Sequence, residues 1–242
     1  MRIGETQPIR EVFSLISSPT SKKTKPNTSK SKTIITKQQL WNLFCNDFFK
    51  IHGKVITQNE DAIENLKVLF YYFLEDSDFF KSKNLIKHLN EPTFNKGLII
   101  IGGVGIGKTA YLKCFENIFH RFSSLRFKGY SAKHLVREFE KCTSPLDKDL
   151  FYNEIDRKRI FIDDIGSEKD ASNYGIINLI GEIISDRYDK NQKTFLTTNF
   201  INANHNVEDT LQALGKRYGH RNYDRLFEMC NIIVFTGQSM RK

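Results

Sequence analysis

A glycine-rich segment that ends in lysine and threonine is the first part of the sequence whose residue types could do chemistry. Residues 102–109 read GGVGIGKT, which fits the pattern G-x-x-x-x-G-K-[ST] in full. Glycines let a loop wrap a phosphate with successive backbone N–H groups, and the N-terminus of a following helix faces the same anion. In this pattern Lys108 reaches the β- and γ-phosphates, and the hydroxyl of Thr109 binds Mg²⁺. The segment therefore predicts an ATP·Mg²⁺ site, whose nucleotide-binding residues are Gly102, Gly103, Val104, Gly105, Ile106, Gly107, Lys108, Thr109 and Ala110.

Two adjacent carboxylates follow a short apolar stretch further along the chain. Residues 159–164 read RIFIDD, a pattern typical of a buried strand that ends in acidic side chains. With a phosphate-binding loop upstream, we expect Asp163 to hold Mg²⁺ through its water shell and Asp164 to polarise the attacking water. The alternative is that the two acids only cap the turn that follows the strand.

A second strand pattern also ends in a polar side chain. Residues 194–199 read TFLTTN, and Asn199 stands 36 positions after Asp163. In a sheet that brings these two strands together, the amide of Asn199 would lie beside the γ-phosphate and help to hold the water. Otherwise the amide caps the turn that follows.

Arginines are concentrated near the C-terminus, where residues 217–226 read RYGHRNYDRL and residues 239–241 read SMR. A guanidinium can neutralise the charge that develops on the γ-phosphate, and arginines beyond the last catalytic strand can reach the site of a neighbouring subunit. Such a run is also typical of a solvated or DNA-facing surface, so spacing alone leaves both interpretations open.

The elements that must position these residues alternate between strands and helices after residue 95. Apolar patterns predict strands at 98–101, 125–130, 160–162, 194–198 and 231–235, and helices at 108–119, 131–142 and 174–187, the second of them capped by Ser131. Five strands joined by helical crossovers imply a parallel sheet with helices on both faces. We therefore expect an α/β domain over residues 96–242.

The first 95 residues divide into two regions. Residues 17–36 are rich in Ser, Thr, Lys and Pro, and between Val12 and Asn46 there are six lysines and no acidic residue. This composition predicts a disordered basic tail over residues 1–36. Residues 37–95 are expected to form a helical region, with one apolar stripe around Trp41 and another over 59–74. The Trp41 stripe could dock a partner protein or pack against its own domain.

Composition narrows the class of protein. A chain of 242 residues can form one sizeable domain with an appendage, and its formal net charge of +9 favours a polyanionic partner such as DNA. No apolar run approaches the roughly 18 residues that cross a membrane, and the N-terminus lacks the apolar stretch of a secretory signal. The four cysteines form no CxxC pair, so we expect ordinary thiols in a reducing cytoplasm.

The order of the segments GGVGIGKT, FIDDIGSE, ISDRYDKNQKTFLTTNF, YGHRNYDRL and GQSMR resembles the DnaC-type helicase loaders and IstB-type transposition ATPases of the AAA+ class. The resemblance covers residues 96–242 and implies a P-loop NTPase with a five-stranded parallel sheet and no C-terminal helical lid. It implies Asn199 as sensor 1, Arg225 as an arginine finger acting on a neighbouring subunit, Arg221 as its companion and Arg241 as the sensor 2 arginine. Asp164 departs from the usual pattern, because most AAA+ proteins have the longer Glu at this position.

Members of these families are similar in acting as ATP switches that assemble on DNA and deliver a partner. The resemblance therefore implies an ATPase that forms homo-oligomers and loads a replicative helicase onto single-stranded DNA, or a helper that presents DNA to a transposase. Two other classes stay open, a small-molecule P-loop kinase and a scaffold that binds ATP but scarcely hydrolyses it. A strand between the P-loop strand and the Asp163 strand argues against a kinase, as does the sensor-like Asn199.

Overall fold

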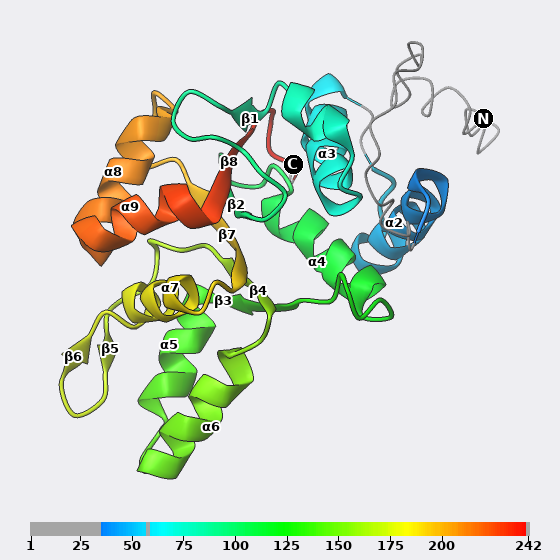
Figure 1. Ribbon diagram of the computed structural model, residues 1–242. Coiled ribbons are helices and arrows are strands. Elements are labelled where there is room, and N and C mark those ends of the chain that lie inside the picture. The colour runs from blue at the N-terminus through cyan, green and yellow to red at the C-terminus, as the bar shows by residue number, and fades with distance from the viewer. Residues whose placement is uncertain (1–34, 57–58, 241–242) are drawn as a thin grey trace, which may run out of the picture. The chain divides into compact units, whose positions relative to one another are not determined.

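A six-stranded sheet runs through the part of the chain that the computed structural model describes, residues 35–56 and 59–240 (Figure 1). Its strands are β1 (Leu85–Ile86), β2 (Gly97–Gly102), β3 (Lys128–Ser131), β4 (Arg159–Asp163), β7 (Lys193–Asn199) and β8 (Cys230–Phe235). Their order across the sheet is β1-β8-β2-β7-β4-β3. The strands from β8 to β3 are parallel, whereas β1 pairs with β8 in the antiparallel direction. The predicted parallel five-stranded sheet is confirmed, and a short edge strand is added to it.

Strand β7 lies between the strand that leads into the P-loop and the strand that ends at Asp163. It pairs with β2, where Gly102 lies opposite Asn199, and with β4, where Ile162 lies opposite Leu196. Because parallel strands end at the same edge of a sheet, the loops that follow β2, β4 and β7 meet there. The strand that argues against a small-molecule kinase is therefore present.

Helices cover both faces of the sheet (Figure 1). They are α2 (Lys37–His52), α3 (Glu60–Phe73), η1 (Ser77–Lys81, a 3₁₀ helix), α4 (Lys108–Phe119), α5 (Ala132–Glu140), α6 (Pro145–Ile155), α7 (Leu179–Asp189), α8 (Val207–Tyr218) and α9 (His220–Met229). The sequence explains where several of them begin. Thr36 forms a capping box with Gln39 at the start of α2, and Ser131 accepts a hydrogen bond at the start of α5, as predicted.

One face of the sheet is covered by an aromatic layer from α2, α3 and α4. The ring centroid of Phe115 in α4 lies 4.9 Å from that of Phe44 in α2 and 4.7 Å from that of Phe73 in α3. Phe73 also contacts Phe195 of β7, with 5.6 Å between centroids. Each such pair stabilises the fold by about 0.5–1.5 kcal/mol beyond its area burial. The N-terminal helices therefore belong to the same compact unit as the sheet, and that unit begins at Ile35.

Most of the apolar stripe of α2 is buried inside the domain. Leu40, Trp41, Phe44 and Phe48 are buried, and the Trp41 ring packs against Phe70 of α3 with 5.7 Å between centroids. Leu43 and Phe49 from the same predicted stripe are exposed. The Trp41 stripe therefore packs against its own domain.

The opposite face of the sheet is mainly aliphatic. Successive side chains of a strand point to opposite faces, so alternate residues of β2 and β4 meet the same helices. Ile99 and Ile101 of β2 and Ile160 and Ile162 of β4 share one buried cluster with apolar side chains of α5, α7, α8 and α9. This cluster fixes the three strands whose ends carry the predicted site.

Two predicted boundaries differ from the structure. The helix expected at 174–187 begins at Leu179, because the preceding residues form the hairpin of β5 (Ala171–Ser172) and β6 (Ile176–Ile177). Tyr174 and Gly175 have positive φ in the turn of this hairpin, which a helix does not allow. The strand expected at 125–130 is β3 at 128–131, because Leu125 and Arg126 still donate to the carbonyl oxygen of Phe122 in turns after α4.

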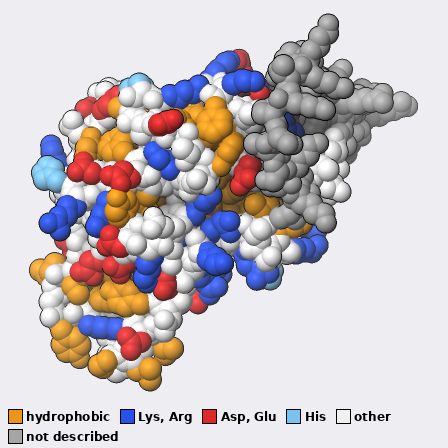
Figure 2. All heavy atoms as spheres, in the orientation of Figure 1, with side chains coloured by type: hydrophobic (Ala, Val, Ile, Leu, Met, Phe, Trp, Pro, Cys, Tyr) orange, Lys and Arg blue, Asp and Glu red, His pale blue; other side chains and the backbone are white. Residues whose placement is uncertain are grey.

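Charged side chains of both signs are mixed over the face shown in Figure 2. Hydrophobic side chains gather at the end of this face where Figure 1 places α6 and the β5–β6 hairpin. The exposed apolar residues of these two elements and their turn are Leu146, Leu150, Tyr174 and Ile176. Within the described residues, no helix has both the length and the apolar character that a membrane span requires.

Candidate active site

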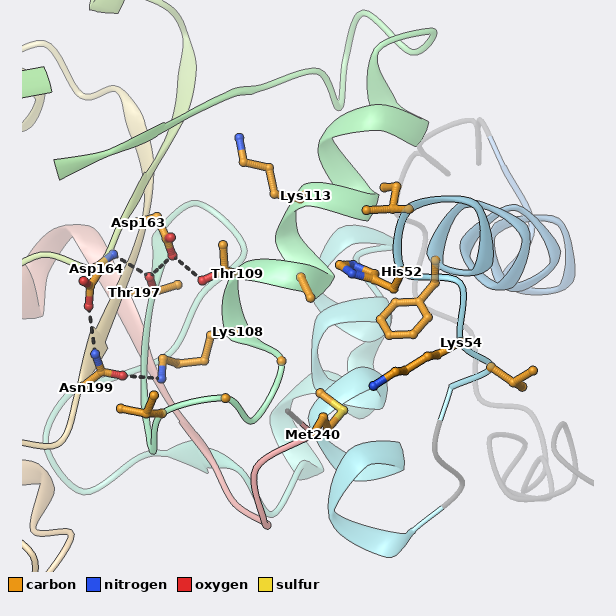
Figure 3. A pocket seen from close by; sticks show the side chains of 17 residues that line it. His52, Lys54, Lys108, Thr109, Lys113, Asp163, Asp164, Thr197, Asn199 and Met240 are labelled. Carbon is orange, nitrogen blue, oxygen red and sulfur yellow. Dashed lines mark hydrogen bonds between the residues drawn. The ribbon is translucent and has the colours of Figure 1, made fainter. Parts of the chain in front are cut away.

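The ends of β2, β4 and β7 bring five of the predicted polar residues to one cavity (Figure 3). The P-loop joins β2 to α4, the two carboxylates follow β4, and Asn199 ends β7. The cavity has a volume of about 700 Å³. The predicted residues that line it are Val104, Gly105, Gly107, Lys108, Thr109, Ala110, Asp163, Asp164 and Asn199.

The loop between β2 and α4 has the backbone that wrapping a phosphate requires. Gly105 and Gly107 have positive φ angles of 82° and 99°. A Cβ on Gly107 would lie 2.4 Å from Cε of Met240 and 2.9 Å from Cζ of Tyr111, so both conformation and space require glycine there. Gly107 is also the N-cap of α4, which places the positive end of that helix at the cavity.

The ammonium of Lys108 lies between the P-loop and the end of β7. Its Nζ donates to the carbonyl oxygens of Gly102 at 2.8 Å and Gly103 at 2.6 Å. It also donates to Oδ1 of Asn199 at 2.9 Å. These contacts hold the cation where it can reach a phosphate bound in the loop.

Three oxygen-bearing side chains form a cluster beside the P-loop. Thr109 Oγ1 donates to Asp163 Oδ1 at 2.8 Å, and Thr197 Oγ1 donates to the same oxygen at 2.6 Å. Mg²⁺ prefers oxygen ligands and is usually held by one or two protein groups together with phosphates and waters. The described residues contain no group of three or more His, Cys, Asp or Glu that could hold a metal on its own. The donor set therefore fits a Mg²⁺ ion that arrives with a nucleotide.

Both carboxylate oxygens of Asp164 accept hydrogen bonds. Asn199 Nδ2 donates to Oδ1 at 2.8 Å, and Ser167 Oγ donates to Oδ2 at 2.7 Å. The backbone of Asp164 has a φ of 60°, in the left-handed region that is sparsely populated for residues other than glycine. Because Asn199 also contacts Lys108, its amide joins the predicted phosphate-binding cation to the predicted catalytic carboxylate.

The other end of the cavity is made by apolar residues and by His52 and Lys54, which sequence reasoning missed (Figure 3). Phe48, Ile51 and Val55, in α2 and just after it, line this end together with Met240. The backbone N–H of Met240 donates to the carbonyl oxygen of Gly105 at 2.9 Å, so the segment after β8 is attached to the P-loop. No sequence motif connects residues 48–55 with the P-loop, and only tertiary packing places them there.

The structure does not bring Arg221 or Arg225 into this cavity. Arg225 lies on α9, where its guanidinium hydrogen-bonds Ser185 and lies 3.0 Å from Oδ1 of Asp189 on α7. Arg221 is exposed in the first turn of α9, and Arg241 lies outside the described residues. Because a finger residue acts on a neighbouring copy, its distance from its own site neither supports nor contradicts that role.

The comparisons with known proteins concern the fold. No protein-family model matches the chain, and no curated protein sequence matches it. The crystal structure of the DnaC helicase loader is similar with a TM-score of 0.54 and 21% identity, over 82% of this chain and 99% of that chain. The crystal structure of DnaI is similar with a TM-score of 0.50 and 20% identity, over 78% and 89%. The P-loop NTPase fold expected from the motif order is thereby confirmed, and the likeness to the DnaC-type loader is one of fold.

Proposed function

We propose that the chain binds ATP with Mg²⁺ and hydrolyses the ATP. The observation that carries this proposal is the hydrogen-bonded series Lys108–Asn199–Asp164 beside the Thr109–Asp163 pair, at the ends of adjacent parallel strands. A phosphate-binding loop, metal-binding oxygens and a carboxylate at the same cavity are the parts that phosphoryl transfer to water requires.

Each residue has a role that follows from its chemistry. The backbone N–H groups of the P-loop and the ammonium of Lys108 bind the β- and γ-phosphates. Thr109 and Asp163 hold Mg²⁺, which neutralises phosphate charge when it is bound. The carboxylate of Asp164 accepts a proton from the attacking water, and Asn199 orients that water from the neighbouring strand.

The two ends of the cavity define the direction of the nucleotide. The polar end, at the P-loop and the strand ends, takes the triphosphate. Phe48, Ile51, Val55 and Met240 at the other end offer apolar surface against which a base can pack, beside the basic side chains of His52 and Lys54. ATP bound in this direction contacts both the P-loop and α2.

The lining of the cavity supports slow hydrolysis by the chain on its own. Both carboxylate oxygens of Asp164 already accept hydrogen bonds, from Asn199 and from Ser167. Each oxygen keeps a second lone pair that can take a proton from water, so these hydrogen bonds hold the carboxylate in place. No arginine among the described residues lines the cavity, so one copy supplies no guanidinium to neutralise the charge on the γ-phosphate. A site of this kind suits a switch, in which ATP stays bound until a partner or a neighbouring copy triggers turnover.

We infer that this switch serves the loading of a replicative helicase onto single-stranded DNA by an assembly of several copies. The solved structure of a helicase loader shares the fold over nearly its whole length. The net charge of +9 suits a DNA partner. Arg225 lies on the surface helix α9, where it could reach the site of a neighbouring copy once its contact with Asp189 opens.

The test measures phosphate release from ATP alone, with single-stranded DNA, and with the replicative helicase of the same host, without any phosphoryl acceptor. We expect slow release that DNA and helicase accelerate, and ATP-dependent transfer of the helicase onto a closed single-stranded circle. The Lys108→Ala protein is the control and should support neither. No phosphate release under any condition would refute the ATPase proposal. Release without helicase transfer would refute only the loader role and would leave a transposition helper as the alternative.

A further inference from the structure

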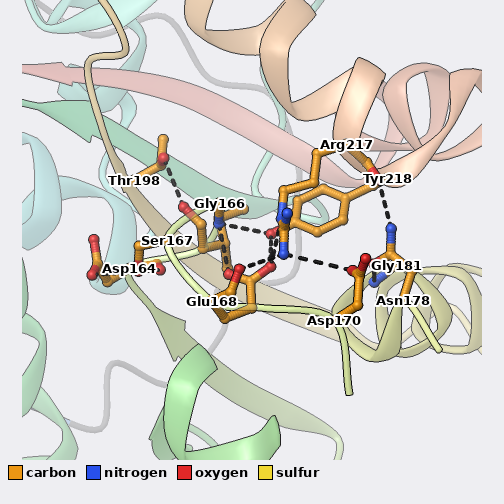
Figure 4. A network of polar contacts seen from close by, with 11 residues as sticks. Asp164, Gly166, Ser167, Glu168, Asp170, Asn178, Gly181, Thr198, Arg217 and Tyr218 are labelled. Carbon is orange, nitrogen blue, oxygen red and sulfur yellow. Dashed lines mark hydrogen bonds and ion pairs between the residues drawn. The ribbon is translucent and has the colours of Figure 1, made fainter. Parts of the chain in front are cut away.

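A buried glutamate next to the candidate active site is held by the end of a distant helix (Figure 4). Glu168 lies in the loop after β4, and its side chain is only 2% exposed. Its Oε1 accepts hydrogen bonds from Arg217 Nε at 3.0 Å and from the Tyr218 hydroxyl at 2.7 Å. Arg217 and Tyr218 are the last two residues of α8. Because an unpaired buried charge is strongly unfavourable, these contacts hold the loop and the helix end together.

The cluster of Glu168, Arg217 and Tyr218 also fixes the backbone next to Asp164. The N–H of Gly166 donates both to Glu168 Oε2 at 2.8 Å and to the Tyr218 hydroxyl oxygen at 2.7 Å. Burial, followed by the charge of Glu168, raises the pKa of Tyr218 well above its usual range, so its hydroxyl keeps the proton that it donates. Ser167 lies between Gly166 and Glu168, and its Oγ lies 2.8 Å from the backbone oxygen and 2.7 Å from Oδ2 of Asp164, the two acceptors within reach of its one proton. The cluster therefore extends to the carboxylate assigned to the attacking water.

The junction between α8 and α9 lies at the other end of the cluster. A single glycine separates Tyr218 from α9, the helix that carries Arg225. The carbonyl oxygen of Arg217 accepts from Asn178 Nδ2 at 2.6 Å, and that of Tyr218 accepts from Asn222 Nδ2 at 2.9 Å. These bonds fasten the junction to the N-cap of α7 and to α9 itself. The polar contacts thus run from α9 to Asp164.

We propose that Glu168 is a positioning residue through which the α8–α9 junction sets the place of Asp164 in the active site. The inference rests on the proposed ATPase function, in which Asp164 acts on water. Glu168 does not line the cavity, so it acts on Asp164 through the loop between them. A shift of α9, such as contact with a neighbouring copy would cause, is passed to the loop by Arg217 and Tyr218.

Two conservative variants test this role by steady-state kinetics. Tyr218→Phe removes the hydroxyl that bridges Gly166 and Glu168. Glu168→Gln removes the charge that faces Arg217 but keeps the size of the side chain, and it serves if the first variant fails to fold. Each should lower kcat about 10-fold and leave KM and ATP affinity within about twofold, because the phosphate contacts are untouched.

The matched control is Tyr130→Phe. Tyr130 is also buried, and its hydroxyl donates to the carboxylate of Glu154 at 2.7 Å, away from the loop after β4. This change removes the same chemical group from a similar environment, and kcat should stay within about twofold of the wild-type value. An equal loss of kcat in the control and in Tyr218→Phe would overturn the proposal.

A second test asks whether Glu168 acts through Asp164. In an Asp164→Asn background, Glu168→Gln should change turnover by no more than about twofold, because the group that it positions is already gone. A further loss as large as that in the wild-type background would overturn the proposal.

Amide hydrogen exchange gives a readout that does not need turnover. Tyr218→Phe and Glu168→Gln should raise the exchange rate of peptides covering residues 164–168 and leave P-loop peptides unchanged, whereas Tyr130→Phe should raise neither. If the wild-type chain released no phosphate, the proposed function would be wrong, yet exchange would still decide whether the cluster holds the loop. If the amide exchange rate of residues 164–168 were unchanged in both variants, the proposal would be overturned, whatever their rates of ATP hydrolysis.

Discussion

Thr109 and Asp163 stand 54 positions apart in the sequence, and their side chains meet with 2.8 Å between Oγ1 and Oδ1. The contact joins the first turn of α4 to the end of β4, although β7 separates β4 from β2 in the sheet. The phosphate-binding and hydrolytic groups therefore come from different strands. Substitutions at single positions should separate nucleotide binding from hydrolysis.

Lys108→Ala should abolish tight ATP binding, weakening affinity by about 100-fold or more, because the phosphates lose a charge-assisted hydrogen bond. Fluorescent-nucleotide titration measures this. Lys113→Ala is the matched control, because Lys113 lines the same cavity but pairs with Glu116 at 2.8 Å. Its affinity should stay within about fivefold of wild type. Unchanged affinity in Lys108→Ala would refute the assignment of the P-loop.

Asp164→Asn should keep ATP bound and slow hydrolysis by a factor on the order of 100, because an amide cannot take the proton from water. Single-turnover phosphate release, set against equilibrium binding, checks this. Asp149→Asn on the exposed face of α6 removes the same charge elsewhere and should leave the rate unchanged. A wild-type rate in Asp164→Asn would show that another acid is the base.

Arg225→Ala should bind ATP normally and lose the acceleration of hydrolysis by DNA or assembly, because its target lies on the neighbouring copy. Mixing it with Lys108→Ala protein should restore part of the activity, since each supplies what the other lacks at a shared interface. Arg157→Ala, which removes another surface arginine paired with Glu154, should keep the acceleration. Loss of ATP binding by monomeric Arg225→Ala would place its action within its own chain.

Deleting residues 1–34 should flatten the salt dependence of DNA binding, because the deletion removes Lys22, Lys23, Lys25, Lys30 and Lys32. The deletion spares Ile35, which is buried, and Thr36, which caps α2. The log–log slope should fall by up to about 3.5 units on single-stranded DNA if all five lysines contact phosphate. ATP-dependent binding should survive. An unchanged slope would mean that the tail is a spacer or a partner tether.

Arg187→Lys should destabilise the fold without touching the site. Arg187 is 3% exposed, and its guanidinium donates to the carbonyl oxygens of Ile155, Arg157 and Lys193 and to Thr194 Oγ1. Burial lowers its pKa to about 10, so it remains a cation at neutral pH. Lysine cannot reproduce this fork of donors, and we expect a loss of about 2–3 kcal/mol and a fall in Tm of about 5–10 °C.

Thermal unfolding of Arg187→Lys is compared with that of Arg137→Lys, because Arg137 is exposed on α5. The control should unfold within about 2 °C of wild type. Equal Tm values for both variants would show that the buried guanidinium does not stabilise the fold.

The strands that carry the site could be predicted because their signals are local. The apolar run of β2 leads directly into the glycine-rich loop, and β4 and β7 each end in polar side chains. The rule that parallel strands end at one edge then brings Lys108, Asp163 and Asn199 together. The β5–β6 hairpin could not be predicted in the same way, because Tyr174 and Ile177 continue the apolar spacing of α7 in the sequence.

Contacts between segments that lie far apart in the sequence could not be predicted from the sequence pattern. The end of the cavity away from the strand ends depends on α2, whose place is fixed by packing such as Phe44 against Phe115. Glu168 and Arg217 each stand in a motif segment, but no spacing within the sequence predicts that they pair across 49 positions. Such contacts follow from tertiary packing, which spacing along one chain does not encode.

The position of β8 has a consequence for how the chain is made. This strand contains residues 230–235, yet it lies between β1 at residues 85–86 and β2 at residues 97–102. The sheet therefore cannot close until residue 235 has left the ribosome. Until then the aromatic stripes of α2, α3 and α4 have no finished sheet to cover, so the nascent chain should depend on chaperones that shield apolar surface during synthesis.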